Sequence, residues 1–157
     1  MERLIVLDTE TTGIRPEEGH RIIEVGAVQI LNREITSTEF HKYVQPNRPV
    51  GDSVNIHGIT DKFLINKPQF NKISDDLLSF IKGATLIIHN APFDLGFLNN
   101  ATSFSLLIKT FWQSFYRFGE VQLENTHASK LFTLGRFSVS CLTKLILTLV
   151  TLALKGL

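Results

Sequence analysis

The sequence is poor in the features that mark secreted, membrane-spanning and strongly basic proteins. Its 157 residues include one cysteine, Cys141, so no internal disulfide can form and a reducing, cytoplasmic location is expected. The most apolar stretch, Leu145–Leu154, contains two threonines and is about half the ~20 residues that a membrane-spanning helix needs. The formal net charge is only +1, so no overall basic field indicates a nucleic-acid partner. These absences predict a soluble globular domain.

Aspartate is missing from the later part of the chain, where none follows Asp94. Residues 1–94 carry 10 Lys/Arg and 13 Asp/Glu, a balance of −3, whereas residues 95–157 carry 6 and 2, a balance of +4. The two acidic residues of the later region are Glu120 and Glu124. The composition therefore changes near residue 95, and an acidic site has to draw its aspartates from the first part of the chain.

Apolar periodicity predicts a mixed α/β domain with short connections. Residues 4–7 are apolar on both faces, as in a central strand, and a turn-rich loop follows at 11–19. Further strands are predicted at 21–31, 37–46 and, as a buried strand, 84–89, and helices at 70–82 and 90–99. The short links between the first three strands favour an antiparallel meander, and the loop at 49–60 has room for one helical turn.

The segment LIVLDTETTG, at 4–13, places two carboxylates at the end of the first predicted strand. Residues two apart in a strand point to one face, so Asp8 and Glu10 present adjacent oxygens. Two buried anions repel unless a cation lies between them, and hard oxygen ligands suit Mg²⁺ or Mn²⁺. The pair therefore resembles half of a divalent metal site. The simpler alternative is that these carboxylates are solvated or cap the next element.

A second segment, LIIHNAPFDLGF at 86–97, brings another carboxylate to the end of a predicted strand. Asp94 follows a turn through Asn90 and lies in the first turn of a helix, where Pro92 suits the N-terminus. If both strands belong to one sheet, Asp94 could close on the same metal site, or it could be an aspartate favoured by the helix dipole. The small hydroxyls and backbone N–H groups of residues 9–13 could hold a phosphate or a chain terminus.

Four ordered blocks resemble the DEDD (DnaQ-like) family of 3′→5′ exonucleases. VLDTETTG at 6–13 is similar to the first exonuclease motif of that family, and HNAPFDLGF at 89–97 is similar to the second. GHRIIEVGAV at 19–28 and NIHGITDKFL at 55–64 match the segments between them. The resemblance is to the proofreading epsilon subunits of bacterial DNA polymerase III, and it extends to about residue 107, where FSLL is its last clear piece.

The resemblance implies a ribonuclease H-like exonuclease fold, with a mixed five-stranded sheet flanked by helices, and 3′→5′ hydrolysis of DNA. Two divalent cations, Mg²⁺ or Mn²⁺, would be held by Asp8, Glu10, Asp94 and a later aspartate. One would activate water and the other would stabilise the leaving oxygen. The implied partners are a single-stranded or mispaired DNA 3′ end, the DNA polymerase III catalytic subunit and a small accessory subunit. The residues implied to contact the terminal nucleotide are Asp8, Thr9, Glu10, Thr11, Asp52, His57, Asn90 and Phe93.

Some of these contacts have simpler explanations in the sequence alone. His57 is also typical of a loop or capping residue, Asn90 of a turn residue and Phe93 of a core residue. Stacking of a base on Phe93 would tolerate any base, which is what a proofreading exonuclease requires.

The chain departs from the family at the third motif, His-x-x-x-x-Asp, which supplies a general base and the fourth carboxylate ligand. The one histidine after His89 is His127, and Phe132 stands five places later. We interpret the chain as a truncated or frame-shifted epsilon-like reading frame, with an exonuclease-like domain at 1–107 and a divergent tail at 108–157. On this interpretation the usual polymerase-binding region is missing. The alternatives are a non-catalytic remnant that binds DNA ends or a replisome partner, and an exonuclease of the same fold that acts on RNA.

Overall fold

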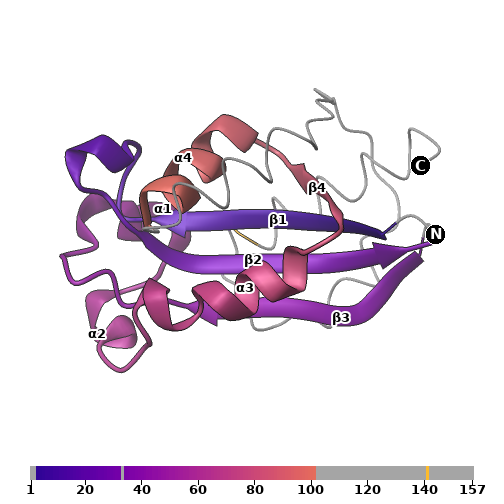
Figure 1. The fold of residues 1–157 in the computed structure, drawn as a ribbon. Helices are drawn as coiled ribbons and strands as arrows, with labels where there is room; N and C mark the ends of the chain where they lie inside the picture. Colours follow the sequence, from indigo (N-terminus) through magenta and orange to yellow (C-terminus); the bar gives the residue numbers. More distant parts are fainter. Residues whose placement is uncertain (1–2, 33, 102–140, 142–157) are drawn as a thin grey trace.

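The computed structural model describes residues 3–32, 34–101 and 141, and this part forms a mixed sheet with helices packed against it (Figure 1). Its strands are β1 (Arg3–Thr11), β2 (Ile22–Leu31), β3 (Glu34–Tyr43) and β4 (Thr85–Ile88). Their order across the sheet is β3-β2-β1-β4. β2 is antiparallel to both β1 and β3, whereas β4 is parallel to β1. The predicted mixed sheet and antiparallel meander are confirmed.

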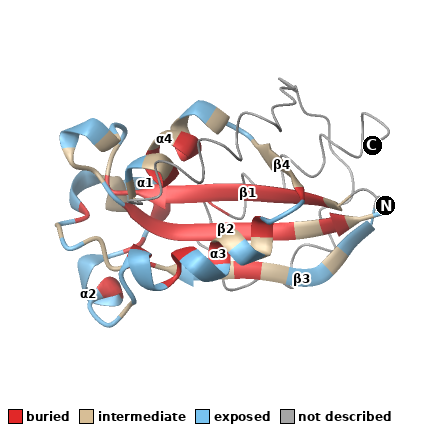
Figure 2. Ribbon diagram, in the orientation of Figure 1, coloured by how far each residue is buried: buried red, intermediate tan, exposed pale blue. Residues whose placement is uncertain are grey.

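The strands differ from their predictions in number, length and burial. The described residues contain four strands, where the family resemblance implied five. β1 is longer than its apolar run because its pairing with β2 continues through the acidic residues to Thr11. The strand at 84–89 was predicted to be buried, but every residue of β4 is half-buried, since β4 forms an edge of the described sheet (Figure 2).

The helices are short, and their ends follow local sequence signals. The predicted helix at 70–82 is divided at Ile73 into a 3-10 turn, η3 (Phe70–Lys72), and α3 (Ser74–Ile81). Gly83 follows with a φ of 72°, a left-handed conformation that glycine adopts without strain. α4 begins directly after Asn90, close to its predicted start. The remaining helical elements are η1 (Pro16–Glu18), η2 (Gly51–Ser53), α1 (Val54–His57), α2 (Asp61–Leu64) and α4 (Ala91–Ala101).

The main hydrophobic core lies between one face of the sheet and helices α3 and α4. Ile5 and Leu7 of β1 point to this face, where Leu77 of α3 and Phe97 of α4 join the same buried cluster. A smaller cluster combines Ile23 with buried residues of the segments around α1 and α2. β1 and β2 are the most buried strands (Figure 2). No helix in the described part of the chain is long and apolar enough to cross a bilayer.

The parallel pairing of β1 and β4 determines where a site can form. Because the two strands run in the same direction, their carboxyl ends lie toward the same end of the sheet. β1 leads into the turn that contains η1, and β4 leads into α4, which contacts η1. Figure 1 shows these segments gathered at that end, with α1 close to them. The acidic end of β1 and the first turn of α4 are therefore brought together.

Candidate active site

The two carboxylates of β1 are buried on one face of the sheet. Asp8 and Glu10 are each 4% exposed. Strand alternation directs their side chains away from the face on which Ile5 and Leu7 meet the helices. Burying neighbouring carboxylates is costly unless they are paired or bind a cation. This face of β1 is therefore the candidate active site.

A third carboxylate lies directly across the sheet from Glu10. The register pairs Glu10 with Glu24 of β2 and Glu24 with Tyr43 of β3, so the three residues form one row on the same face. Glu24 is fully buried, and its Oε1 accepts a 2.8 Å hydrogen bond from Nε2 of His41. Burial raises the pKa of Tyr43 far above its usual range, and the charge of Glu24 and a hydrogen bond to it raise that pKa further.

His41 belongs to the neighbouring row of the sheet, together with Asp8. The register pairs Asp8 with Gly26 and Gly26 with His41. The His41 ring packs edge-on against Tyr43, with centroids 4.8 Å apart. Sequence reasoning missed His41, Tyr43 and Glu24 as site residues. One signal was available, because Glu24 interrupts an otherwise apolar run of β2, where a carboxylate needs a specific partner.

Asp94 is bonded to the residue that separates the two carboxylates of β1. It lies in the first turn of α4 and is 2% exposed. Its Oδ1 accepts hydrogen bonds from the backbone N–H of Thr9 at 2.9 Å and from the Thr9 hydroxyl at 2.7 Å. Asp94 is thus brought next to the strand that carries Asp8 and Glu10, as expected if β1 and β4 belong to one sheet. Its part in metal binding, and a contact between Thr9 and a nucleotide, stay predictions.

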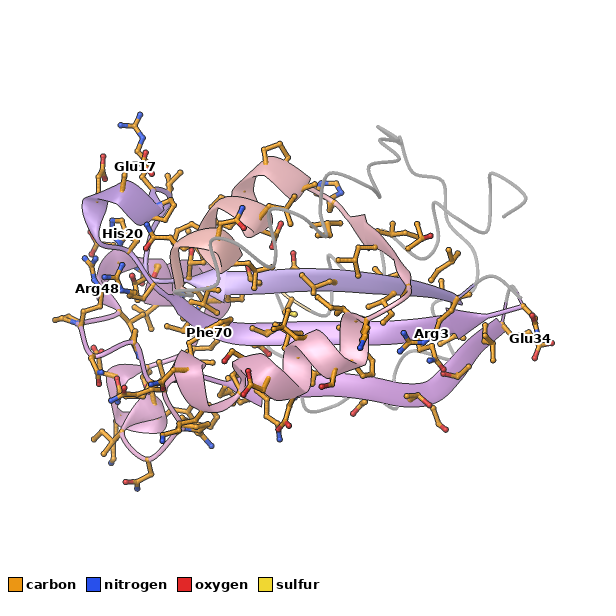
Figure 3. The ribbon with its side chains drawn as sticks, viewed as in Figure 1. Arg3, Glu17, His20, Glu34, Arg48 and Phe70 are labelled. Carbon is orange, nitrogen blue, oxygen red and sulfur yellow. The ribbon has the colours of Figure 1, made fainter. Side chains whose placement is uncertain are left out.

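The turn after β1 is held by hydrogen bonds between its two ends. The hydroxyl oxygen of Thr12 accepts from the N–H of Arg21 at 3.0 Å and lies 3.1 Å from Nδ1 of His20. The Thr11 hydroxyl donates to the carbonyl of Gly13 at 2.6 Å. The His20 ring fills the space beside Gly13, so that a Cβ on Gly13 would overlap it. These contacts hold the turn in place at the edge of the candidate site. His20 is labelled in Figure 3.

His57 is buried, and both of its ring nitrogens have partners in its own loop. Nδ1 accepts from the N–H of Ile59 at 3.0 Å, and Nε2 lies 3.1 Å from Oγ of Ser53. The Ser53 hydroxyl donates to the carbonyl of Val50 at 2.8 Å. Because Nδ1 accepts, the proton of the neutral ring belongs on Nε2, which donates to Ser53. This geometry is that of a loop-capping histidine, and a contact between His57 and a nucleotide stays a prediction.

The other predicted contact residues differ in their exposure. Asp52 in η2 and Asn90 before α4 are exposed. The carbonyl of Asn90 accepts from the N–H groups of Phe93 at 2.9 Å and Asp94 at 3.3 Å, so Asn90 shapes the first turn of α4. Phe93 is half-buried and packs on Phe97, with ring centroids 5.0 Å apart. The simpler roles of Asn90 and Phe93 are therefore present, and their contacts with a nucleotide stay predictions.

The donor set suits a divalent cation that is bound together with a substrate phosphate. Asp8 and Glu10 supply the hard oxygen atoms that Mg²⁺ and Mn²⁺ prefer. Over the described ranges 3–32, 34–101 and 141, no group of three or more His, Cys, Asp or Glu side chains could hold a metal ion. Mg²⁺ usually binds through one or two carboxylates and substrate phosphates rather than in a protein cage. A buried pair of carboxylates therefore fits this cation.

The region of the missing third motif lies outside the described residues. This applies to Glu120, Glu124, His127 and Phe132, and to the segment FSLL at 104–107. Cys141 is described, and it is helical and fully buried.

The chain is similar to bacterial replication proteins over most of its length. The exonuclease family RNase_T matches residues 5–153. The DNA polymerase III subunit epsilon of Pasteurella multocida (strain Pm70) is 53% identical over 102 residues, which cover 62% of this chain and 40% of that protein. The subunit epsilon of Rickettsia typhi (strain ATCC VR-144 / Wilmington) is 44% identical over 148 residues, which cover 90% and 61%. The chain thus spans less than two thirds of the length of either relative.

A solved structure shows which fold this sheet belongs to. A product-bound exonuclease I aligns with a TM-score of 0.68 over 98% of this chain and 43% of that chain, at 15% sequence identity. Similarity at this identity is evidence of the fold, and it confirms the predicted ribonuclease H-like exonuclease architecture. The family match also extends beyond residue 107, to residue 153.

Proposed function

Since this chain belongs to the RNase_T exonuclease family, we propose that it is an epsilon-type 3′→5′ exonuclease that removes terminal nucleotides from DNA. The observation that carries the proposal is the buried pair of Asp8 and Glu10 at the carboxyl end of β1. Asp94 is hydrogen-bonded to the residue between them, Thr9. The relatives are subunits of DNA polymerase III, which supports proofreading with the catalytic subunit and a small accessory subunit as partners. The chain spans only part of those relatives, so this association is proposed along with the activity.

Asp8 and Glu10 would hold one or two divalent cations, Mg²⁺ or Mn²⁺. Asp94, which forms no three-carboxylate group with them in the structure, would have to turn from Thr9 toward the cation to become a further ligand. The chemistry supplied by a cation in this position would be the activation of a water molecule and the stabilisation of the charge that develops on the phosphate and on the leaving oxygen. Burial excludes water from the two carboxylates. Their attraction for a cation is stronger as a result, because less water screens their charges. Thr9 fixes the orientation of Asp94 through two hydrogen bonds to Oδ1.

The 3′-terminal nucleotide would lie over the carboxyl end of β1. Thr11, Asp52 and Asn90 belong to β1, η2 and the β4–α4 turn, and they would contact the sugar and the phosphate. Phe93 would stack on the base without regard to its identity. His57 would turn its Nε2 proton from Ser53 to a phosphate oxygen. These contacts would hold a frayed or single-stranded end in place for hydrolysis.

The missing His-x-x-x-x-Asp motif affects the expected rate. A positioned general base contributes about 10²–10⁴-fold, and each tenfold loss is about 1.36 kcal/mol in the barrier. We therefore propose slow hydrolysis, by a site whose carboxylates in the described residues are Asp8, Glu10 and Asp94.

A second candidate function is a non-catalytic protein that binds DNA ends or a replisome partner. It is favoured by the sequence, in which no aspartate follows Asp94 to complete a four-carboxylate site. Because binding alone releases no mononucleotide, one assay separates the two candidates.

The first experiment measures mononucleotide release from the 3′ end of a single-stranded DNA oligonucleotide with Mg²⁺ or Mn²⁺. It compares the unchanged chain with Asp8→Asn and Asp76→Asn. Asp76 is an exposed carboxylate of α3, so its substitution removes the same charge away from the site. We expect release by the unchanged chain and by Asp76→Asn. In Asp8→Asn we expect the rate of release to fall by at least about 100-fold, because substituting residues that only hydrogen-bond to metal ligands already lowers activity about 10–100-fold.

Two results contradict the catalytic proposal. One is the absence of release from a folded, unchanged chain, and the other is equal release from Asp8→Asn. An RNA oligonucleotide of the same sequence, assayed in parallel, tests the preference for DNA, because the 2′-OH distinguishes the two substrates.

A further inference from the structure

We propose that Glu24, held by His41 and Tyr43, is a positioning residue that tightens divalent-cation binding by Asp8 and Glu10. The inference rests on the proposed function, because it takes Asp8 and Glu10 as the metal-binding pair. Glu24 acts through Glu10 and is not itself a ligand.

The strand register places Glu24 against Glu10. Directly paired residues of an antiparallel ladder have Cβ atoms about 4.5–5.5 Å apart on the same face. Glu10 and Glu24 are such a pair, and the register runs without a shift from Arg3 and Leu31 to this point. The one irregularity between β1 and β2 comes after Glu10. Glu24 therefore faces Glu10 wherever the sheet is intact.

Three buried carboxylates gather on two adjacent strands as a result. Asp8, Glu10 and Glu24 are 4%, 4% and 0% exposed. Like charges opposite one another destabilise a sheet, and burial removes the water that would screen them. A cation held by Asp8 and Glu10 relieves this repulsion, so a third carboxylate behind the pair increases the attraction for the cation. Glu24 would supply that attraction from the neighbouring strand, in the same row as Glu10.

Two side chains of β3 keep Glu24 in place. Nε2 of His41 donates to it at 2.8 Å, and the hydrogen bond between Tyr43 and Glu24 holds the carboxylate from the same side of β2. The Tyr43 ring in turn packs edge-on against Phe63, with centroids 4.7 Å apart. Glu24 is thus fixed on its β3 side, and its charge acts toward Glu10 on the other. A residue that orients a metal ligand without binding the metal is expected to be held in this way by its own hydrogen bonds.

The test is a titration of the DNA-free chain with Mn²⁺, in which free Mn²⁺ is measured by electron paramagnetic resonance. Glu24→Gln keeps the size and an acceptor oxygen but removes the charge. Tyr43→Phe removes one bond to Glu24 and keeps the ring. Glu34→Gln is the matched control, because Glu34 is an exposed carboxylate at the far end of the same sheet (Figure 3). We expect the Mn²⁺ affinity to fall about 10–100-fold in Glu24→Gln, less in Tyr43→Phe and not at all in Glu34→Gln.

Circular dichroism establishes first that each variant is folded. A folded Glu24→Gln chain with the unchanged affinity overturns the inference, and if that variant does not fold, an unchanged affinity of Tyr43→Phe overturns it. Asp8→Asn is titrated alongside to separate this outcome from a failure of the proposed function. If the unchanged chain binds no Mn²⁺, or if Asp8→Asn binds it equally well, the metal site itself is absent and the inference fails with it.

Discussion

Thr9 links helix α4 to the strand that carries the carboxylate pair. It is fully buried, and its hydroxyl donates to Asp94 at 2.7 Å while its backbone N–H donates to the same oxygen. Thr9→Val keeps the shape of the side chain and the backbone bond but removes the hydroxyl. Because hydrogen bonds to charged groups contribute about 1.5–3 kcal/mol, we expect the free energy of unfolding to fall by about that amount in a urea titration.

The matched control for this change is Thr38→Val. Thr38 is exposed in β3, so the same substitution there is expected to change stability by no more than about 0.5 kcal/mol. Equal stabilities of Thr9→Val and Thr38→Val would show that the hydroxyl bond to Asp94 does not hold α4 to β1.

At the scale of elements, the β1–β2 turn depends on the absence of a side chain at Gly13. The ring of His20 occupies the space that a Cβ would need, and the ring lies beside the hydroxyl of Thr12. Gly13→Ala therefore has to displace the ring or the backbone, and overpacking of this kind costs about 1–3 kcal/mol. We expect thermal unfolding to show this loss, and we expect most of it to disappear when Gly13→Ala is made in a His20→Ala background.

A second glycine provides the opposite expectation for the same substitution. Gly96 lies inside α4, where a Cβ would meet only Pro16, at an ordinary distance of 3.8 Å. Gly96→Ala should stabilise the protein by about 0.5–1 kcal/mol, because glycine loses more chain entropy than alanine in a helix. Equal losses in Gly13→Ala and Gly96→Ala, or no rescue by His20→Ala, would contradict the role given to the His20 ring.

The elements could be predicted more fully than the contacts between them. Apolar runs, short connections and strand alternation can be read locally from the chain. They predicted β1, the meander and a shared face for Asp8 and Glu10, respectively. The break at Ile73 was missed, because a 3-10 turn and an α-helix satisfy nearly the same apolar spacing over so few residues. The pairing of Glu10 with Glu24 depends on register, which is set by contacts between separate strands. No local pattern specifies it.

The same distinction explains what could be predicted at the site. The two acidic segments were recognised, and placing both strands in one sheet allowed Asp94 to approach Asp8 and Glu10. The bond between Thr9 and Asp94 required the position of α4 over the sheet, and the internal bonds of His57 required the folded path of the 50–59 loop. Residues that act through neighbours in other elements are therefore the ones that a single sequence hides.

At the scale of the whole molecule, Cys141 tests whether the chain divides at residue 107. It is fully buried, and it contributes to the raised pKa of Tyr43 in β3. A buried thiol reacts only when the structure opens, and opening equilibria of small domains span about 10³–10⁸. We therefore expect Cys141, the single cysteine, to react with a disulfide reagent at least about 10³-fold more slowly than in the unfolded chain.

The matched control is Ser37→Cys with Cys141→Ser, which places the thiol on an exposed site of β3 and should react at the unfolded rate. If Cys141 reacts as fast as this control while the sheet remains folded, residues 108–157 form a separate tail. If it is protected, Cys141 is buried in solution as it is in the structure, which contradicts a division that leaves this part of the chain unfolded.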